Sequence, residues 1–371
     1  MLIDRLTETF LEIQDPLSSL RRKAWDRFQE MGLPDSSDEA FKYVPMERLY
    51  EEDFAPERQD VSHFVSSPDP RVIVLPITDA LRTYGGFLQN RWSKILKTET
   101  DPFALLNLAL HSQGVFIYVP PKTIIEEPLR CVFEGKGTYF PRIEIFLAEG
   151  SSLSLITTPM SGQLVCPLID ASVEEGAQFY HYEIDAHSQW HLGSLRAALK
   201  KDSRMTHIQV VKNAGISRRS IHVHLGGENA EVSLQGLCQL GGKSQAHTYA
   251  TVEHARPHTR SMQKFKAALS DLSKSSFEGK IYVHPIAQKT EAYQRSSTLL
   301  LGEHALSYAR PNLEIFADDV KASHGATVAQ LNREQLFYLR SRGLNDTLAK
   351  QLLLDGFCRE ITSQIPYDFS I

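Results

Sequence analysis

A long succession of short β-type segments, from residue 114 to residue 328, is the feature that most restricts how this chain can fold. The segments are rich in β-branched and aromatic residues, often alternate between apolar and polar positions, and are separated by Gly, Asn, Asp and Ser. Only the segment from Arg260 to Leu272 is ambiguous between strand and helix. The pattern predicts a large, mainly β domain over residues 113–328.

A recurring turn within this domain narrows the architecture. Short turn motifs begin at Glu149, Glu175, Glu228 and Glu303. Their successive separations are close to one, two and three multiples of a repeat of roughly 26 residues, a length typical of solenoids, propellers and arrays. In a β-helix such turns lie at the same corner of successive coils, and the inward residues stack into one core. We therefore expect a β-solenoid with these four turns at one corner.

The region before the β domain, residues 1–112, is predicted to be rich in helix. Apolar residues recur at helical spacing from Leu6 to Ile13 and again from Leu20 to Met31. A short strand is expected at Arg71 to Pro76, and Asp101 with Pro102 is typical of the start of a helix, here one that extends to His111.

The region after the β domain, residues 329–371, is predicted to be helical. Asn332 and Gln335 form a capping-box pattern, and Gly343 lies where a helix favours a C-terminal glycine. Asn345 begins a second helix. It carries an apolar stripe of Leu348, Leu352, Leu353, Phe357 and Ile361. This stripe is expected to pack on the β domain, to dock a partner, or to do both.

Charge and cysteine content exclude several classes of function. The formal net charge of -5 over 371 residues gives no reason to expect a nucleic-acid surface. The sequence has no apolar run of membrane-spanning length and no signal-peptide pattern, so a cytoplasmic protein is expected. Its four cysteines are far apart and suggest small buried side chains in a reducing compartment, not a zinc site or disulfides. They are Cys131, Cys166, Cys238 and Cys358.

The segment from Leu237 to Ser244 resembles a phosphate-binding loop because it ends in Gly-Lys-Ser. The first glycine of that motif is replaced by Leu237, and the residues that follow have strand character where a helix would be required. We therefore expect an ordinary turn at Gly241 and Gly242, and no nucleotide site.

A second near match concerns metal chemistry. His222, His224 and Glu228 come close to the cupin pattern, in which two histidines and a glutamate hold a metal ion. The His-x-His spacing places both imidazoles on one face of a strand. Glu228, however, belongs to the recurring turns, and no second cupin motif follows. A cupin-like metalloenzyme using these three residues as ligands is therefore the alternative hypothesis.

Several separated motifs carry a resemblance to a known family. They are Ala317-Asp318-Asp319-Val320-Lys321, Ser323-His324-Gly325-Ala326-Thr327, Leu336-Phe337-Tyr338-Leu339, Phe277-Glu278-Gly279-Lys280-Ile281, Ala287-Gln288-Lys289-Thr290 and His254-Ala255-Arg256-Pro257-His258-Thr259. Gly32-Leu33-Pro34 and Glu39-Ala40-Phe41-Lys42-Tyr43 add a match near the start of the chain. Together and in this order they resemble the SufD branch of the SufB/SufD family, the iron–sulfur cluster assembly scaffolds of the SUF system.

The resemblance implies a fold and a role. The fold is a right-handed parallel β-helix flanked by helical N-terminal and C-terminal regions. The role is that of a non-enzymatic scaffold that pairs through the β-helix with SufB, or with a second copy of itself, and docks the ATPase SufC through its C-terminal helices. The SufC-docking candidates are Leu336, Phe337, Leu339, Leu348, Leu352 and Phe357. ATP hydrolysis would belong to SufC, no cofactor would be bound permanently, and no nucleic acid or membrane would be a partner.

His324 is the leading candidate for chemistry, with Asp318 and Asp319 beside it in sequence. These residues have turn character, so we expect a glycine-flanked turn in which an imidazole and carboxylates converge on iron. The resemblance implies that His324 lies at the SufB interface, where an iron–sulfur cluster or iron is held transiently. The alternative is a histidine that only packs in a dimer.

One departure from the family pattern limits this expectation. Ala322 stands where many members carry a cysteine, so any thiolates would come from the partner. The paralogous SufB type is a further alternative, against which the missing cysteine and the Ser-His-Gly-Ala-Thr motif argue.

Overall fold

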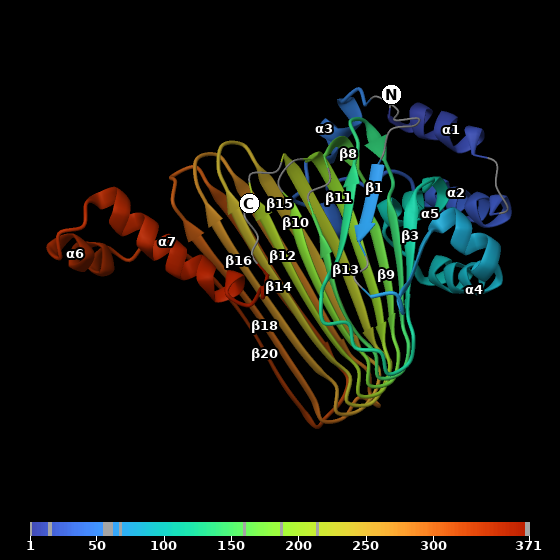
Figure 1. Ribbon diagram of the computed structural model, residues 1–371. Coiled ribbons are helices and arrows are strands. Elements are labelled where there is room, and N and C mark those ends of the chain that lie inside the picture. Colours follow the sequence, from blue (N-terminus) through green and yellow to red (C-terminus); the bar gives the residue numbers. More distant parts are fainter. Residues whose placement is uncertain are drawn as a thin grey trace.

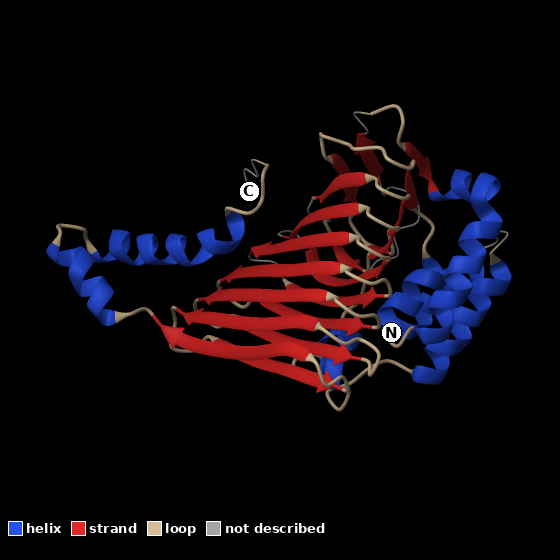
Figure 2. Ribbon diagram, turned by 90° about the horizontal axis from the view of Figure 1, so that it is seen from below, coloured by secondary structure: helices blue, strands red, loops and turns tan. Residues whose placement is uncertain are grey.

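Two facing β-sheets form a tapered stack, with helices on opposite sides of it (Figures 1 and 2). The structure is a computed structural model, and it describes residues 2–13, 17–54, 62–66, 69–158, 161–185, 188–212 and 215–367. The chain alternates between the two sheets, so each coil adds one strand to each of them. The prediction of a parallel β-solenoid is confirmed.

The nine-stranded sheet contains, in spatial order, β1 (Ser62–Ser66), β4 (Leu129–Glu134), β7 (Ser152–Thr157), β10 (Gln178–Asp185), β12 (Arg204–Lys212), β14 (Glu231–Leu240), β16 (Arg260–Leu269), β18 (Thr290–Leu300) and β20 (Val320–Gln330). The path of the eleven-stranded sheet is β2 (Ile73–Pro76), β3 (Gly114–Val119), β6 (Arg142–Leu147), β9 (Leu168–Val173), β11 (Ser188–Leu199), β13 (Ile216–Leu225), β15 (Gln245–His254), β17 (Lys274–Val283) and β19 (Leu306–Ile315). The short strands β5 (Thr138–Tyr139) and β8 (Gly162–Val165) extend this sheet beside β11. The ambiguous segment at Arg260 is therefore a strand.

Stacked apolar residues hold the coils in register. Leu147, Val173, Leu199 and Leu225 are paired from strand to strand in β6, β9, β11 and β13, and all four are fully buried. The length of one coil in this part of the stack is 26 residues, the interval that also separates the paired residues His181 and His207 in the other sheet. Equivalent inward positions therefore recur at a fixed interval, and their burial favours the solenoid over any arrangement that would expose them.

The corner turns confirm three of the four expected positions. The backbone N–H of Gly150 donates to the carbonyl of Glu175, and that of Asp202 donates to the carbonyl of Glu228, so Glu149, Glu175 and Glu228 share one corner. The prediction was wrong for Glu303, which lies at the opposite corner between β18 and β19. Later coils are longer, since His224 and its strand partner Glu253 are 29 residues apart. In this part of the chain, a residue that lies a multiple of 26 positions after Glu228 is therefore no longer at the same corner.

The N-terminal helices pack against part of the outer face of the eleven-stranded sheet, beside β2, β3, β8, β11 and the start of β13 (Figure 1). They are α1 (Leu2–Glu12), α2 (Ser18–Met31), the short 3-10 helix η1 (Glu39–Phe41), α3 (Met46–Glu51), α4 (Ile77–Thr98) and α5 (Pro102–Leu110). Trp25, Phe28 and Trp92 from the helices share one buried cluster with Phe116 and Trp190 from the sheet. The N-terminal helices and the sheet therefore have a common hydrophobic core.

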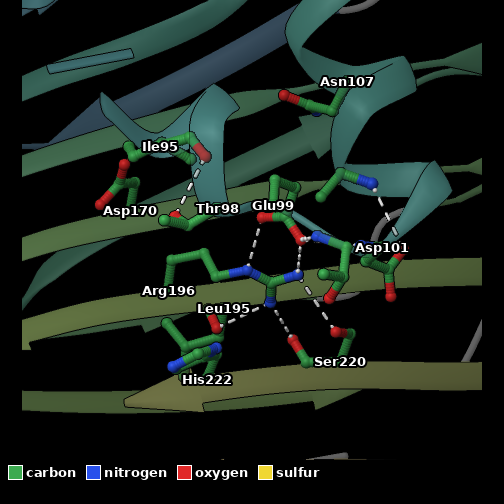
Figure 3. A network of polar contacts seen from close by, with 12 residues as sticks. Ile95, Thr98, Glu99, Asp101, Asn107, Asp170, Leu195, Arg196, Ser220 and His222 are labelled. Carbon is green, nitrogen blue, oxygen red and sulfur yellow. Dashed lines mark hydrogen bonds and ion pairs between the residues drawn. The ribbon is translucent and has the colours of Figure 1, made fainter. Parts of the chain in front are cut away.

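Buried ion pairs join this helical layer to the sheet, and Figure 3 shows the one between Arg196 and Glu99. The Arg196 guanidinium on β11 bonds both carboxylate oxygens of Glu99 at 2.8 Å, and Arg218 on β13 bonds Asp101 at 2.7 Å. Asp101 also caps α5, as its sequence position predicted, by accepting from the N–H of Phe103 at 2.9 Å. Burial raises the pKa of both carboxyl groups, but the two arginines outweigh it and hold the pKa of Glu99 and of Asp101 below their ordinary values.

Two C-terminal helices, α6 (Arg333–Ser341) and α7 (Asp346–Thr362), project from the other side of the stack (Figure 2). The predicted caps are present: Asn332 accepts from the N–H of Gln335 at 3.0 Å, and Asn345 accepts from that of Leu348 at 2.9 Å. Gly343 follows α6 with a φ of +92°, a left-handed conformation that favours glycine.

Further predictions about local structure are also borne out. The segment that resembled a phosphate-binding loop is the turn between β14 and β15, with Gly242 at a φ of +58°. Cys131, Cys166 and Cys358 are buried and Cys238 is half-buried, and all four are free thiols.

None of the helices in the described part of the chain has the length and apolar character of a membrane span. The division into domains at residues 112 and 328 stays a prediction.

Candidate functional site

The last coil of the solenoid is open. β19 and β20 end the two sheets, and no described strand pairs with their outer edges. Large apolar side chains are exposed there: Leu306 by 42%, Tyr308 by 40%, Phe316 by 55% and Val328 by 48%. At the opposite end of the stack, the antiparallel strands β1 and β2 lie beside the first parallel strands β4 and β3. The open end therefore offers both unpaired backbone groups and apolar surface.

His324 lies on β20, within this open end. The expectation of a glycine-flanked turn was wrong, because Ser323, His324 and Gly325 continue the strand that spans Val320–Gln330. Asp318 and Asp319 form the corner before the strand, where the Asp319 N–H donates to the Gln288 side-chain oxygen at 2.9 Å. At about 3.3 Å per residue, the strand separates Asp319 from His324 by roughly 16 Å. The three residues do not converge on one point.

His324 instead continues a row of polar residues inside the solenoid. It is paired in register with Gln294, which is paired with Gln263 on the next strand. Both glutamines are buried, and the Gln294 side-chain amide donates to the Gln263 side-chain oxygen at 2.9 Å. His324 is exposed because no further described coil covers it. Its imidazole is therefore the first member of this row that a partner could reach.

A ladder of alternating charges also ends at the open coil. Glu231, Arg260, Glu291 and Lys321 occupy paired positions on successive strands of the nine-stranded sheet. Arg260 lies 2.9 Å from Glu231 and 3.9 Å from Glu291, and Lys321 lies 3.3 Å from Glu291. Lys321 is a cation on the last strand, so an approaching strand with an acidic residue would extend the alternation.

The predicted SufC-docking residues divide into two groups. Leu336, Phe337 and Leu339 on α6, with Leu348 and Leu352 near the start of α7, lie on the projecting helices; Phe337 is 75% exposed, and α6 has no buried residue. Phe357 instead packs at the solenoid, where the Lys266 ammonium lies 4.0 Å from its ring centre. Cys358 and Ile361 pack beside it against the outer face of the nine-stranded sheet. The apolar stripe therefore has an anchored half and an exposed half.

The cupin alternative finds no support. His222 and His224 do share one face of β13, but Glu228 lies in the corner turn beyond the strand. Their carboxylate neighbour is Glu253 on β15, whose Oε2 lies 2.8 Å from His224 Nδ1 and 3.7 Å from His222 Nε2. His284 Nε2 lies 2.5 Å from Glu253 Oε1. The neighbouring imidazoles of His222, His224 and His284 hold the pKa of Glu253 far below its ordinary value.

Glu253 and His284 were not among the residues predicted from the sequence, although the sequence contained a signal for them. Glu253 follows His224 by 29 residues and His284 follows Glu253 by 31 residues, and each interval is about one coil in this part of the solenoid. The buried pairs Glu99–Arg196 and Asp101–Arg218 were missed as well. Those pairs join residues 97 and 117 positions apart and have no spacing from which they could be found. Among the described residues, no group of three or more His, Cys, Asp or Glu side chains is arranged to hold a metal ion.

Comparison with known proteins identifies the family to which this chain is similar. The family model described as SUF system FeS cluster assembly, SufBD core domain, matches residues 131–357, and that of the SufBD protein N-terminal region matches residues 7–69 and 59–131. The core match includes the open coil, His324 and most of α7. The two matches together account for most of the chain.

Individual relatives agree with the family models. An iron–sulfur cluster assembly SufBD family protein of Synechocystis is 30% identical over 72% of this chain, and the match spans 63% of that relative's length. The iron–sulfur cluster assembly protein SufD of Escherichia coli is 27% identical over 90% of this chain and 86% of its own. The iron–sulfur cluster assembly protein SufB of Bacillus subtilis is 24% identical over 95% of this chain and 79% of its own. The chain belongs to the SufBD family of iron–sulfur cluster assembly proteins.

Proposed function

We propose that this protein is a SufD-type, non-enzymatic scaffold subunit that pairs through its open coil with a SufB-type subunit or a second copy of itself. The observation that carries the proposal is the last coil, where β19 and β20 end their sheets among the described strands and exposed apolar side chains lie beside them. A long exposed strand edge favours association with another strand, because its N–H and C=O groups have no partner.

The projecting helices supply the second contact of the proposed complex. α6 and the first half of α7 expose Phe337, Tyr338, Leu348 and Leu352, while the second half of α7 is anchored on the solenoid. An apolar helical surface held at one end suits docking into a groove of a partner protein. We assign this surface to the ATPase SufC, which would supply ATP hydrolysis to the complex.

His324 is assigned to the assembly of the cluster itself. The cluster is cargo in this proposal, held transiently between subunits and not bound as a permanent cofactor. Ala322 supplies no ligand, and the corner carboxylates Asp318 and Asp319 lie far along the strand, so His324 is the ligand this chain offers. The partner would contribute the thiolates that iron–sulfur clusters require.

The proposal is tested by co-expressing the chain with SufB and SufC homologues from the same host and isolating the complex through a tag on this chain. Val328→Asp places a charge on the open coil and is expected to remove the SufB-type subunit. Phe337→Asp is expected to remove SufC alone. Leu11→Asp is the matched control, because Leu11 is a similarly exposed apolar residue, 64%, on the distant helix α1.

His324→Ala addresses the chemistry separately. The complex should assemble as in the wild type, while anaerobic reconstitution should yield much less bound iron and sulfide. Loss of the complex would identify His324 as a packing residue. Absence of any complex in the wild type, or equal losses in the Leu11→Asp control, would overturn the scaffold proposal.

A further inference from the structure

A group of three histidines surrounds one glutamate on the outer face of the eleven-stranded sheet, away from β20. His222 and His224 are on β13, Glu253 is on the neighbouring strand β15, and His284 directly follows β17. A ring nitrogen of each imidazole lies near the same carboxylate, at nitrogen-to-oxygen distances of 3.7 Å, 2.8 Å and 2.5 Å respectively. The family role proposed above makes no use of these residues.

The backbone beneath the group is a rigid platform. His224 and Glu253 are direct partners in the parallel ladder between β13 and β15, and Glu253 is in turn paired with Tyr282 on β17. Parallel neighbours lie about 4.8 Å apart and present their side chains on the same face. The ladder therefore fixes the spacing of His224 and Glu253, and His222 lies two residues before His224 on the same strand. His284 lies one residue beyond β17.

The side chains have room to adjust. Their exposed fractions are 48% for His222, 43% for His224, 34% for His284 and 27% for Glu253. Three neutral imidazoles and a carboxylate are ligands that zinc prefers, with ligand atoms at about 2.0–2.2 Å from the metal. Two ligand atoms of a tetrahedral site are then roughly 3.3 Å apart. The three nitrogen-to-oxygen separations, each measured to one of the two carboxylate oxygens of Glu253, bracket that value.

We propose that His222, His224, His284 and Glu253 form a surface site for one divalent transition-metal ion of the zinc class. The four side chains now interact with one another and do not form a ready-made cage, so metal binding replaces the shared protons with the ion. Small rotations of exposed side chains suffice, and the strands stay in place. The site is distinct from the open coil and does not depend on the scaffold role.

The proposal is tested on the full chain, stripped of metal and titrated with zinc chloride against a chromophoric chelator. We expect one zinc ion per chain at this site, and visible ligand-field bands of tetrahedral geometry when cobalt replaces zinc. Glu253→Gln keeps the size of the side chain but removes its charge, and His222→Ala combined with His224→Ala removes two ligands. Each variant should weaken zinc binding at least about tenfold, since even outer-shell changes cost this much at metal sites.

A matched control separates this site from general histidine binding. His304→Ala changes an exposed histidine in a turn at the opposite corner. This variant should retain the wild-type stoichiometry and the cobalt spectrum. The substituted residues are all partly exposed, and far-ultraviolet circular dichroism will verify that each variant is folded. Wild-type affinity no greater than that of the double variant, or equal weakening in His304→Ala, would overturn the proposal.

Discussion

The two helical regions of this protein are attached to the same solenoid in opposite ways. The N-terminal helices share a continuous hydrophobic core with the eleven-stranded sheet and are joined to it by the buried pairs Glu99–Arg196 and Asp101–Arg218. Of the C-terminal helices, α7 packs on the nine-stranded sheet around Cys358 and Ile361, and α6 buries no residue. The difference indicates that the first region stabilises the fold, whereas the second is available to bind another protein.

Removing one charge from the ion pairs that attach the N-terminal helices should have the largest effect on the free energy of unfolding. Asp101→Asn retains a side chain able to cap α5 but leaves the buried Arg218 without a charged partner. Breaking a buried ion pair in this way costs about 3–5 kcal/mol. Chemical denaturation should show a loss of this size, with lower protection of α5 in hydrogen exchange. A change within about 0.5 kcal/mol, as expected for an ordinary surface substitution, would show that the pair contributes little to the attachment.

Ile361→Ala, in the half of α7 that packs on the nine-stranded sheet, should have a large but local effect on stability. Ile361 is fully buried between α7 and the nine-stranded sheet, and Ile→Ala at such sites typically costs about 2–5 kcal/mol. Because few other residues attach this region, the helices should detach while the solenoid stays folded. Hydrogen exchange should accelerate in α6 and α7 alone. Slower or unchanged exchange there, or unfolding of the entire chain, would contradict the comparison.

Acid should weaken the attachment of the N-terminal helices to the sheet. The folded pKa values of Glu99 and Asp101 lie below their unfolded values, which are about 4.3 and 3.9. Their contribution to stability is therefore complete above pH of about 4.5 and is lost as pH falls through the folded values. A titration of stability from neutral pH into the acid range should show this loss in the wild type. Asp101→Asn should show a smaller acid-dependent loss, since one of the two groups no longer titrates.

Changing the exposed half of α7 should have the smallest effect on stability. Leu352 is 53% exposed, so Leu352→Ser should alter the free energy of unfolding by no more than about 0.5 kcal/mol. The same variant should weaken binding of the SufC homologue in a pull-down assay. Comparison with Ile361→Ala tests the division of α7 directly. A stability loss as large as that of Ile361→Ala would mean that Leu352 is part of the anchor.

Features formed by residues close together in the chain were predicted correctly more often than features formed by residues far apart in the chain. The caps at Asn332 and Asn345 and the helix start at Asp101 involve close neighbours in the chain, and the sequence predicted them correctly. The role of His324 stays a prediction, but the expected local structure was wrong. Its Ser-His-Gly surroundings have turn character, and the ladder with β18 overrides that preference because pairing satisfies the backbone of the whole segment.

The sequence by itself determined the solenoid, because a coil of near-constant length must repeat its inward apolar residues at a near-constant interval, as Leu147 to Leu225 do. The tertiary structure decided which polar residues meet, although coil-length intervals in the sequence were a signal for the contact of His224 with Glu253. Glu303 lies at the opposite corner because the later coils are longer. The carboxylate neighbour of His222 and His224 is Glu253 and not Glu228. Arg196 pairs with Glu99, which is distant in the chain. Such contacts depend on the register between coils and on how the helices lie over them, and neither is encoded in the spacing of a single segment.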